Sequence, residues 1–175
     1  MAYNKCGMEQ PKNSPYPIRS FSPSDSAACK ALYLEGIIKG KIADNDTGYD
    51  IEDIESAYMK YPGNHFWVSH TDDGQVIGMV GVQQHDEGVG EIRRLRVAVP
   101  FRRRGIGAAL METALKFCHE KSYLKVKLDT YMDETAAVQL FEKFRFHHDH
   151  TKTLGEKALM YFYFDLYSRG ESTQG

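Results

Sequence analysis

The chain has 175 residues, of which 42% are hydrophobic, and this supplies one ordinary domain with a substantial core but not two. Its formal net charge of -2 gives no general attraction to nucleic acid or to an anionic membrane, and no apolar run is long enough to span a bilayer. The three cysteines are odd in number and lack any C-x-x-C spacing, which argues against a disulfide framework and a structural zinc site and favours a reducing, cytoplasmic location.

The N-terminal part of the chain predicts a strand and two helices. Residues 1–15 lack the hydrophobic core of a signal peptide and are expected to be a disordered lead-in. A short strand is predicted over 16–21, and Ser22-Pro23-Ser24-Asp25 resembles a capping box with proline at the first helical position. After a turn-rich loop, Asp50 and Asp53 can cap a second helix that Pro62-Gly63 ends.

The central part predicts a run of strands followed by a helix. Segments 65–70 and 75–84 are expected to pair across Asp72-Asp73-Gly74, a strong hairpin signal. A third strand is expected over 91–99 and leads into a helix that begins after Gly107.

The remaining segments complete a domain over residues 16–167, with a polar tail at 168–175. They are a half-buried strand at 124–128, a helix after Asp133, and two strands divided at Gly155. The predicted order is β-α-α-β-β-β-α-β-α-β-β, an α/β (α+β) arrangement.

A basic, glycine-containing loop joins the strand 91–99 to the helix after it. Gly105 and Gly107 let the backbone approach a ligand closely, and the start of the helix presents N–H groups and the positive end of its dipole. The adjacent arginines add positive charge and forked donors; they are Arg102, Arg103 and Arg104. The sequence therefore predicts a phosphate-binding loop, here called the basic loop (residues 102–107).

The run RRRGIG in this loop resembles the R/Q-x-x-G-x-G/A pyrophosphate loop of the GNAT superfamily, the acyl-CoA-dependent N-acyltransferases, and the element order resembles the GNAT fold. The resemblance covers residues 16–167 and implies a mixed, mostly antiparallel sheet of about seven strands flanked by about four helices. It implies acetyl-CoA as co-substrate and no metal. In that fold the strands corresponding to 94–97 and 123–129 splay apart and expose main-chain groups to the pantetheine arm.

The resemblance also assigns residues to the cofactor. Those expected to contact coenzyme A are Leu95, Arg96, Val97, Arg102, Arg103, Arg104, Gly105, Ile106, Gly107, Ala108, Glu134 and Phe141.

Acyl transfer to an amine needs a base for the amine and a proton for the departing thiolate. Glu91 falls where some GNAT members place a catalytic glutamate, and strand alternation predicts one face for Glu91, Arg93, Leu95 and Val97. The alternative is a solvated glutamate at the start of a strand.

The proton donor is where this sequence departs from the family pattern. Phe141 stands where a tyrosine is usual, Glu134 stands where an asparagine often touches the cofactor, and Arg145 replaces a glycine, which suggests a different turn. Since Phe141 cannot donate a proton, the donor is water or another group such as Tyr131, whose alternative role is a wet tyrosine at a strand end.

Acidic residues gather in and after the loop between the first two helices, which borders the acceptor site in the GNAT fold. We therefore hypothesise a cationic amine acceptor, although a solvated surface is the simpler interpretation. These residues are Asp44, Asp46, Asp50, Glu52, Asp53 and Glu55. The resemblance also allows a homodimer.

Two other classes of protein stay open. One is a catalytically silent coenzyme A-binding or regulatory module, which Phe141 favours. The other is a dinucleotide-binding oxidoreductase, because Asp129 ends the strand after the basic loop. Against it, Leu110 stands where the dinucleotide-binding pattern has its third glycine.

The run His147-His148-Asp149-His150 suggests a metal, yet alternating directions along a strand let few of these side chains share one ion. The arginines near residue 100 could suggest nucleic acid, but one phosphorylated cofactor explains them.

Overall fold

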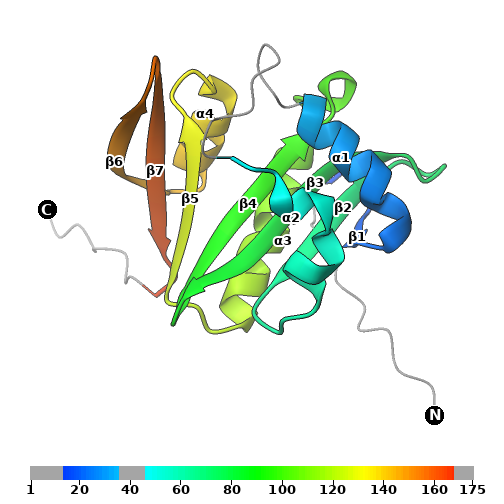
Figure 1. The fold of residues 1–175 in the computed structure, drawn as a ribbon, viewed down its shortest axis with the longest axis horizontal. Helices are drawn as coiled ribbons and strands as arrows, with labels where there is room; N and C mark the ends of the chain where they lie inside the picture. The colour runs from blue at the N-terminus through cyan, green and yellow to red at the C-terminus, as the bar shows by residue number, and fades with distance from the viewer. Residues whose placement is uncertain (1–13, 36–45, 168–175) are drawn as a thin grey trace, which may run out of the picture.

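The computed structural model describes residues 14–35 and 46–167. The expected lead-in, apart from its last two residues, the polar tail and most of the acidic loop lie outside these ranges. Within them, the elements follow the predicted order β-α-α-β-β-β-α-β-α-β-β, which confirms the expected fold (Figure 1).

A single mixed sheet forms the centre of the molecule. Its seven strands lie in the order β1-β2-β3-β4-β5-β7-β6, and only β4 and β5 are parallel neighbours. The strands are β1 (Ile18–Ser20), β2 (His65–His70), β3 (Val76–Asp86), β4 (Val89–Val97), β5 (Lys125–Tyr131), β6 (His147–Leu154) and β7 (Lys157–Asp165).

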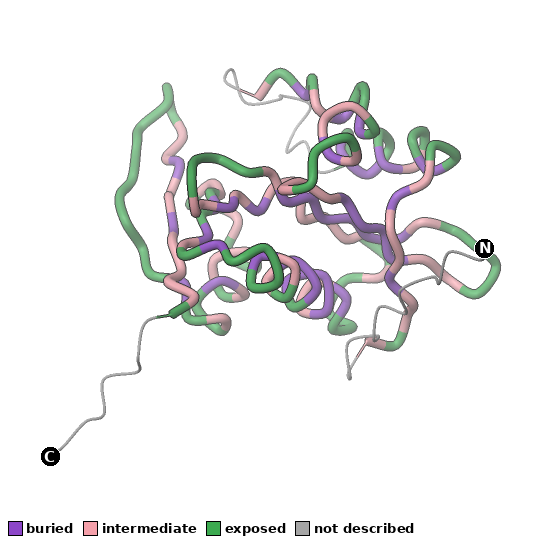
Figure 2. The backbone as a smooth tube through the Cα atoms, turned by 90° about the horizontal axis from the view of Figure 1, so that it is seen from below, coloured by how far each residue is buried: buried purple, intermediate pink, exposed green. Residues whose placement is uncertain are grey.

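Helices cover both faces of the sheet, as the view along it shows (Figure 2). One face carries α1 (Ser26–Glu35) and α2 (Tyr49–Glu52), whose apolar side chains form one buried cluster with Phe66, Val68 and Met79. The other face carries α3 (Ile106–Glu120) and α4 (Thr135–Lys143), which pack with Trp67, Val82 and Ile92. The faces are called the α1/α2 face and the α3/α4 face below.

The second predicted helix is shorter than its sequence suggests. α2 begins at Tyr49 after Gly48, whose φ of 62° is a left-handed value that glycine tolerates, and it ends at Asp53, where the backbone leaves helical geometry. A π-helical turn follows over Glu55–Met59. Asp53 caps this turn by accepting a hydrogen bond from the amide of Ser56, whereas Asp50 caps nothing and turns to side-chain partners instead.

Candidate active site

The strands β4 and β5 pair over only a short length and then diverge. Their pairing runs from Val89 with Lys125 to Glu91 with Lys127. Beyond it, β4 continues along β3 as far as Val97, and β5 continues along β7 as far as Tyr131 (Figure 1). This divergence, called the fork below, leaves the facing edges of both strands without each other's hydrogen bonds.

A β-bulge in β4 lies at the fork. Arg93 pairs with Gly81 and Arg96 with Met79, so Arg94 and Leu95 together oppose the single residue Val80. Arg94 adopts a φ of 58°, the left-handed region that non-glycine residues rarely occupy.

The bulge overturns the predicted alternation of β4. Leu95 and Val97 pack with Ile92 on the α3/α4 face, whereas Glu91 and Arg93 lie on the α1/α2 face with their neighbour Gln83. The prediction that Glu91, Arg93, Leu95 and Val97 share one face is therefore wrong, because the extra residue at the bulge reverses the side-chain direction beyond it.

The basic loop and the start of α3 lie at the open end of the fork. Arg103 and Gly105 have left-handed φ values of 62° and 80°, and Gly105 directly precedes α3. The first amides of the helix have no acceptor within it. The three arginine side chains are exposed, and none forms an ion pair with a carboxylate in the described residues. The loop thus offers backbone donors and positive charge at one place, as a pyrophosphate requires.

The carbonyl groups expected to hold the pantetheine arm already have side-chain partners. The carbonyl oxygen of Leu95 accepts a hydrogen bond from Nη1 of Arg96 at 3.0 Å, and that of Val97 accepts one from Nε of Arg102 at 3.1 Å. Each carbonyl oxygen has two lone pairs, so a further donor can still be accommodated.

Glu91 lies at the closed end of the fork. Its carboxylate is 3.4 Å from Nδ1 of His85, and it has Asp129 of β5 as an electrostatic neighbour. Although Asp129 as a residue is exposed, desolvation of its carboxyl group and then the negative charge of Glu91 raise its pKa above its usual range. Two carboxylates from different strands therefore influence each other on the α1/α2 face, where they would favour a positively charged or proton-donating group.

Asp129 is a residue that the sequence did not assign to the site. In the sequence it stands out only as the residue that ends a half-buried strand, and this position supports the dinucleotide-binding alternative rather than the acyltransferase site. The pair with Glu91 depends on the parallel register between β4 and β5, which sequence patterns do not specify.

The suggested proton donor Tyr131 lies at the far end of β5 from the pair formed by Glu91 and Lys127. It is half-buried, and the ammonium group of Lys157 lies 5.1 Å from the centre of its ring. The structure therefore brings Asp129, rather than Tyr131, to Glu91.

Phe141 fills the core of the α3/α4 face. It is 5% exposed, and its ring meets Phe162 edge to face with centroids 5.6 Å apart. Glu134, just before α4, interacts electrostatically with Arg96. Arg145, expected to change the turn after α4, instead takes a left-handed φ of 62°, the conformation that glycine favours at the end of a helix.

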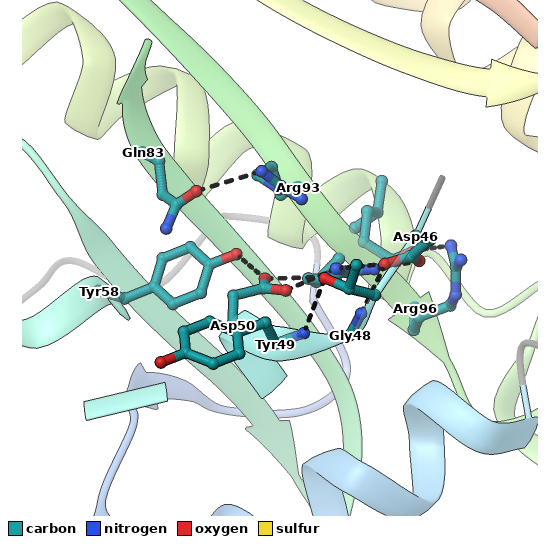
Figure 3. Close-up of polar contacts among 11 residues, drawn as sticks. Asp46, Gly48, Tyr49, Asp50, Tyr58, Gln83, Arg93 and Arg96 are labelled. Carbon is teal, nitrogen blue, oxygen red and sulfur yellow. Dashed lines mark hydrogen bonds and ion pairs between the residues drawn. The ribbon is translucent and has the colours of Figure 1, made fainter. Parts of the chain in front are cut away.

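Arg94 neutralises two of the acidic residues on which the cationic-acceptor hypothesis depended. Its guanidinium contacts Asp46 at 2.6 Å and Asp50 at 2.5 Å, and it lies over the ring of Tyr33. Tyr58 donates a hydrogen bond to Asp50, and Figure 3 shows these two side chains pointing toward one another. Burial is the largest single effect and would raise the pKa values of Asp46 and Asp50, but the hydrogen bonds and the positive charge of Arg94, with smaller contributions from other neighbours, together outweigh it, so both pKa values are lowered.

Arg93 and Arg96 have no carboxylate ion pair within the described residues. Arg93 donates to Oε1 of Gln83 at 3.3 Å (Figure 3). Arg96 donates to the carbonyl of Leu95, and its Nε is buried without a partner in the described part of the chain. Burial, and then the positive charge of Arg94, lower the pKa of Arg96.

The histidine-rich run lies on the edge strand β6, where its rings pack on aromatic residues of β7. His150 stacks on Tyr161 with centroids 4.4 Å apart, and His147 contacts Tyr163. Over residues 14–35 and 46–167, no three His, Cys, Asp or Glu side chains are arranged to hold a metal ion. None of the helices in these ranges is long and apolar enough to cross a membrane.

A fork between two parallel strands, beside a glycine-containing loop at a helix start, defines the architecture of an acyl-CoA-dependent transferase. The model of the acetyltransferase (GNAT) family matches residues 34–146, and the chain belongs to this family. The match confirms the resemblance drawn from the basic loop and the element order. It favours an acetyltransferase over the dinucleotide-binding oxidoreductase.

Among curated proteins, the chain is 40% identical over 100 residues to N-acetylaspartate synthetase of Rattus norvegicus and of Homo sapiens, which covers 57% of this chain and 33% of each relative. It is 33% identical over 102 residues to N-acetyltransferase 8 of Homo sapiens, covering 55% of this chain and 44% of that protein. The chain thus matches about a third of the length of the N-acetylaspartate synthetases.

Solved structures share the fold at lower identity. An acetyltransferase of the GNAT family from Staphylococcus aureus Mu50 has a TM-score of 0.76 at 20% identity, covering 86% of this chain and 99% of that one. The yncA protein from Salmonella typhimurium, solved with its cofactor acetyl-CoA, has a TM-score of 0.74 at 16% identity, covering 93% and 100%.

Proposed function

We propose that the protein transfers an acetyl group from acetyl-CoA to a primary amine by direct attack in a ternary complex. The observation that carries this proposal is the placement of the basic loop and Glu91 at opposite ends of one fork. A coenzyme A thioester is long enough to have its phosphates at one end and its acyl group near the other. The yncA structure with acetyl-CoA and the name of the relatives, which describes an N-acetylated product, support this chemistry.

Different segments would bind different parts of coenzyme A. The main-chain amides from Arg103 to Ala108 and the arginines of the basic loop would hold the pyrophosphate. The unpaired edge of β4 at Leu95 and Val97 would hold the pantetheine arm, as an added strand would be held. Gly105 supports this assignment, because its left-handed φ and lack of a side chain open the loop to a ligand.

The reaction needs a neutral amine, and Glu91 is the proposed base. As the amine nitrogen attacks the thioester carbon, the carbon–sulfur bond breaks, and the nitrogen passes a proton to the Glu91 carboxylate directly or through water. The leaving thiolate takes its proton from water in this proposal, because Phe141 has no hydroxyl group and Tyr131 lies at the other end of the fork.

The preference for a cationic acceptor loses part of its basis, because Arg94 already neutralises Asp46 and Asp50. The cytoplasmic location and the homodimer stay predictions. Cys29 and Cys118, which are buried free thiols, support a reducing compartment.

The proposal is tested by calorimetric titration with acetyl-CoA and by a thiol-release screen across amines. We expect saturable binding of acetyl-CoA and amine-dependent release of free coenzyme A. Binding without turnover for any amine would instead favour the silent coenzyme A-binding module, which the buried Phe141 keeps open. No binding at millimolar acetyl-CoA would remove the proposal entirely.

A further inference from the structure

Arg96 projects from β4 onto the α1/α2 face of the fork. Its cross-strand neighbour Met79 packs in the cluster of that face, and its electrostatic neighbours are Arg94, Glu134, Asp46 and Arg102. Figure 3 shows Arg96 beside Asp46, on the far side of it from Tyr58. The resemblance assigned Arg96 to the cofactor, but its side chain lies on the face that borders the acceptor.

The guanidinium group of Arg96 is left largely without partners. Of its five donors, one bonds to the carbonyl of Leu95, and the buried Nε has no partner within the described residues. Of the two neighbouring carboxylates, Asp46 is committed elsewhere, because both of its oxygens accept hydrogen bonds from Arg94. Glu134 attracts Arg96 electrostatically but forms no ion pair with it within the described residues. A partly buried cation with open donors is costly unless an anion completes it.

A carboxylate is the group that matches these open donors. The planar fork of an arginine binds the two oxygens of a carboxylate side by side, and the low dielectric of a partly buried site strengthens that bond. The three exposed arginines of the basic loop already provide for the phosphates of the cofactor. Arg102 is an electrostatic neighbour of Arg96, but the helix α3 that the loop begins packs on the opposite face of the sheet.

The opposite charge lies on the same face at the closed end of the fork. Glu91 and Asp129 place two carboxylates there, where an ammonium group of an incoming acceptor would be held before it loses its proton. The α1/α2 face therefore presents negative groups near the acyl position and an uncompensated arginine farther along β4. An acceptor with charges of both signs fits this arrangement better than a polyamine does.

We propose that the acceptor is an amine that also carries a carboxylate, and that Arg96 binds this carboxylate. The inference rests on the proposed acetyl transfer and adds the substrate class to it. Arg96 is then a specificity-determining residue, while Glu91 acts on the amine.

The test compares acceptors that differ only in a carboxylate or its amide, such as glycine with glycinamide and β-alanine with β-alaninamide. An amide lowers the pKa of the neighbouring amine and by itself favours the amide, so a preference for the carboxylate is not a basicity effect. We expect kcat/KM to be about 10- to 100-fold higher for the carboxylate in at least one pair.

Two variants with the same substitution locate the effect. Arg96→Gln is expected to remove most of that preference, whereas Arg103→Gln in the basic loop raises the KM for acetyl-CoA and leaves the preference unchanged. Since Arg96→Gln removes a partly buried charge that has no ion-pair partner within the described residues, we expect the variant to fold, and a thermal melt checks this. Arg96→Glu provides a second measurement, because it should shift the preference toward diamines.

The two proposals fail in different ways. If the wild-type protein acetylates both members of every pair equally, or if Arg96→Gln keeps the preference, the carboxylate inference is overturned and acetyl transfer stands. If acetyl-CoA neither binds nor releases thiol with any acceptor, both are overturned.

Discussion

Arg94 donates two hydrogen bonds to Asp50, from Nε to Oδ2 at 2.9 Å and from Nη2 to Oδ1 at 2.5 Å. The arginine belongs to the bulge of β4, and the aspartate to the short helix α2. Tyr58 donates to the same carboxylate at 2.5 Å, so one buried polar group joins three elements of the α1/α2 face. Because the bulge lies at the fork, this contact holds the α1/α2 face against the strand that carries Glu91.

Replacing Arg94 is expected to destabilise the protein strongly. The Arg94 side chain is 7% exposed and that of Asp50 is 11% exposed, so Arg94→Ala leaves two carboxylates without their countercharge. We expect a loss of about 3 kcal/mol in the free energy of unfolding, measured by urea denaturation. The control is Lys30→Ala. The Lys30–Glu52 pair likewise involves α2, which it joins to α1, but it is largely exposed. Its loss should therefore cost less than about 1 kcal/mol. Equal losses in the two variants would contradict the role of Arg94.

The same contact predicts a loss of stability in acid. Burial is the largest single effect on Asp50 and raises its pKa, but the hydrogen bonds from Arg94 and Tyr58 and the charge of Arg94 together lower the folded-state pKa below the unfolded value of about 3.9. A lowered folded pKa means that the stabilisation is fully present above the unfolded pKa and is lost as pH falls through the folded pKa.

Urea denaturation at a series of pH values checks this prediction. Asp50→Asn should be less stable than wild type near neutral pH, but it should lose less stability between about pH 5 and pH 3, because it has no carboxylate at this position to protonate. Parallel curves for the two proteins would show that Asp50 does not supply the acid-sensitive stability.

The basic loop is tested by a pair of glycine variants. Gly105 and Gly74 have similar left-handed φ values, 80° and 88°, but Gly74 lies in the turn between β2 and β3, where an added Cβ would meet no atom within 4 Å. Alanine should cost about 1–2 kcal/mol of stability at either position, because the left-handed conformation is strained for any residue with a Cβ. Only Gly105→Ala should also weaken acetyl-CoA binding in calorimetry. A similar loss of affinity in Gly74→Ala would show that the loop geometry is not the cause.

The order of elements and the basic loop could be predicted from the sequence because both depend on local patterns. The strand predicted over 65–70 agrees with β2, since its alternation and the following Asp-Asp-Gly turn lie within a few residues of each other. The second helix was predicted too long. Its apolar spacing continues through Asp53, but there the backbone leaves helical geometry and a π-helical turn follows.

The candidate site could be predicted only in part, because it depends on contacts between distant residues. Glu91 and the basic loop are proposed as parts of the site from their place along the chain. The bulge at Arg94 was missed, because the position of an extra residue is set by pairing with β3 and not by the residue type. The acidic residues Asp46 and Asp50 looked like a surface for cations, since nothing in the sequence shows that Arg94, far along the chain, neutralises them.

Glu91 is the residue on which the proposed chemistry depends most. Glu91→Gln keeps the size of the side chain but removes the base, so we expect kcat/KM to fall about 100- to 10,000-fold. We also expect the curve of kcat/KM against pH to differ from that of the wild type on its acidic side. The control is Glu87→Gln, an exposed glutamate in the turn before β4, which should leave the rate unchanged.

Glu91→Gln has a second readout at Asp129, whose pKa is raised first by burial and then by the charge of Glu91. Removing that charge should lower the pKa of Asp129 in a carboxyl NMR titration, and an unchanged value would show that the two carboxylates do not interact across the fork.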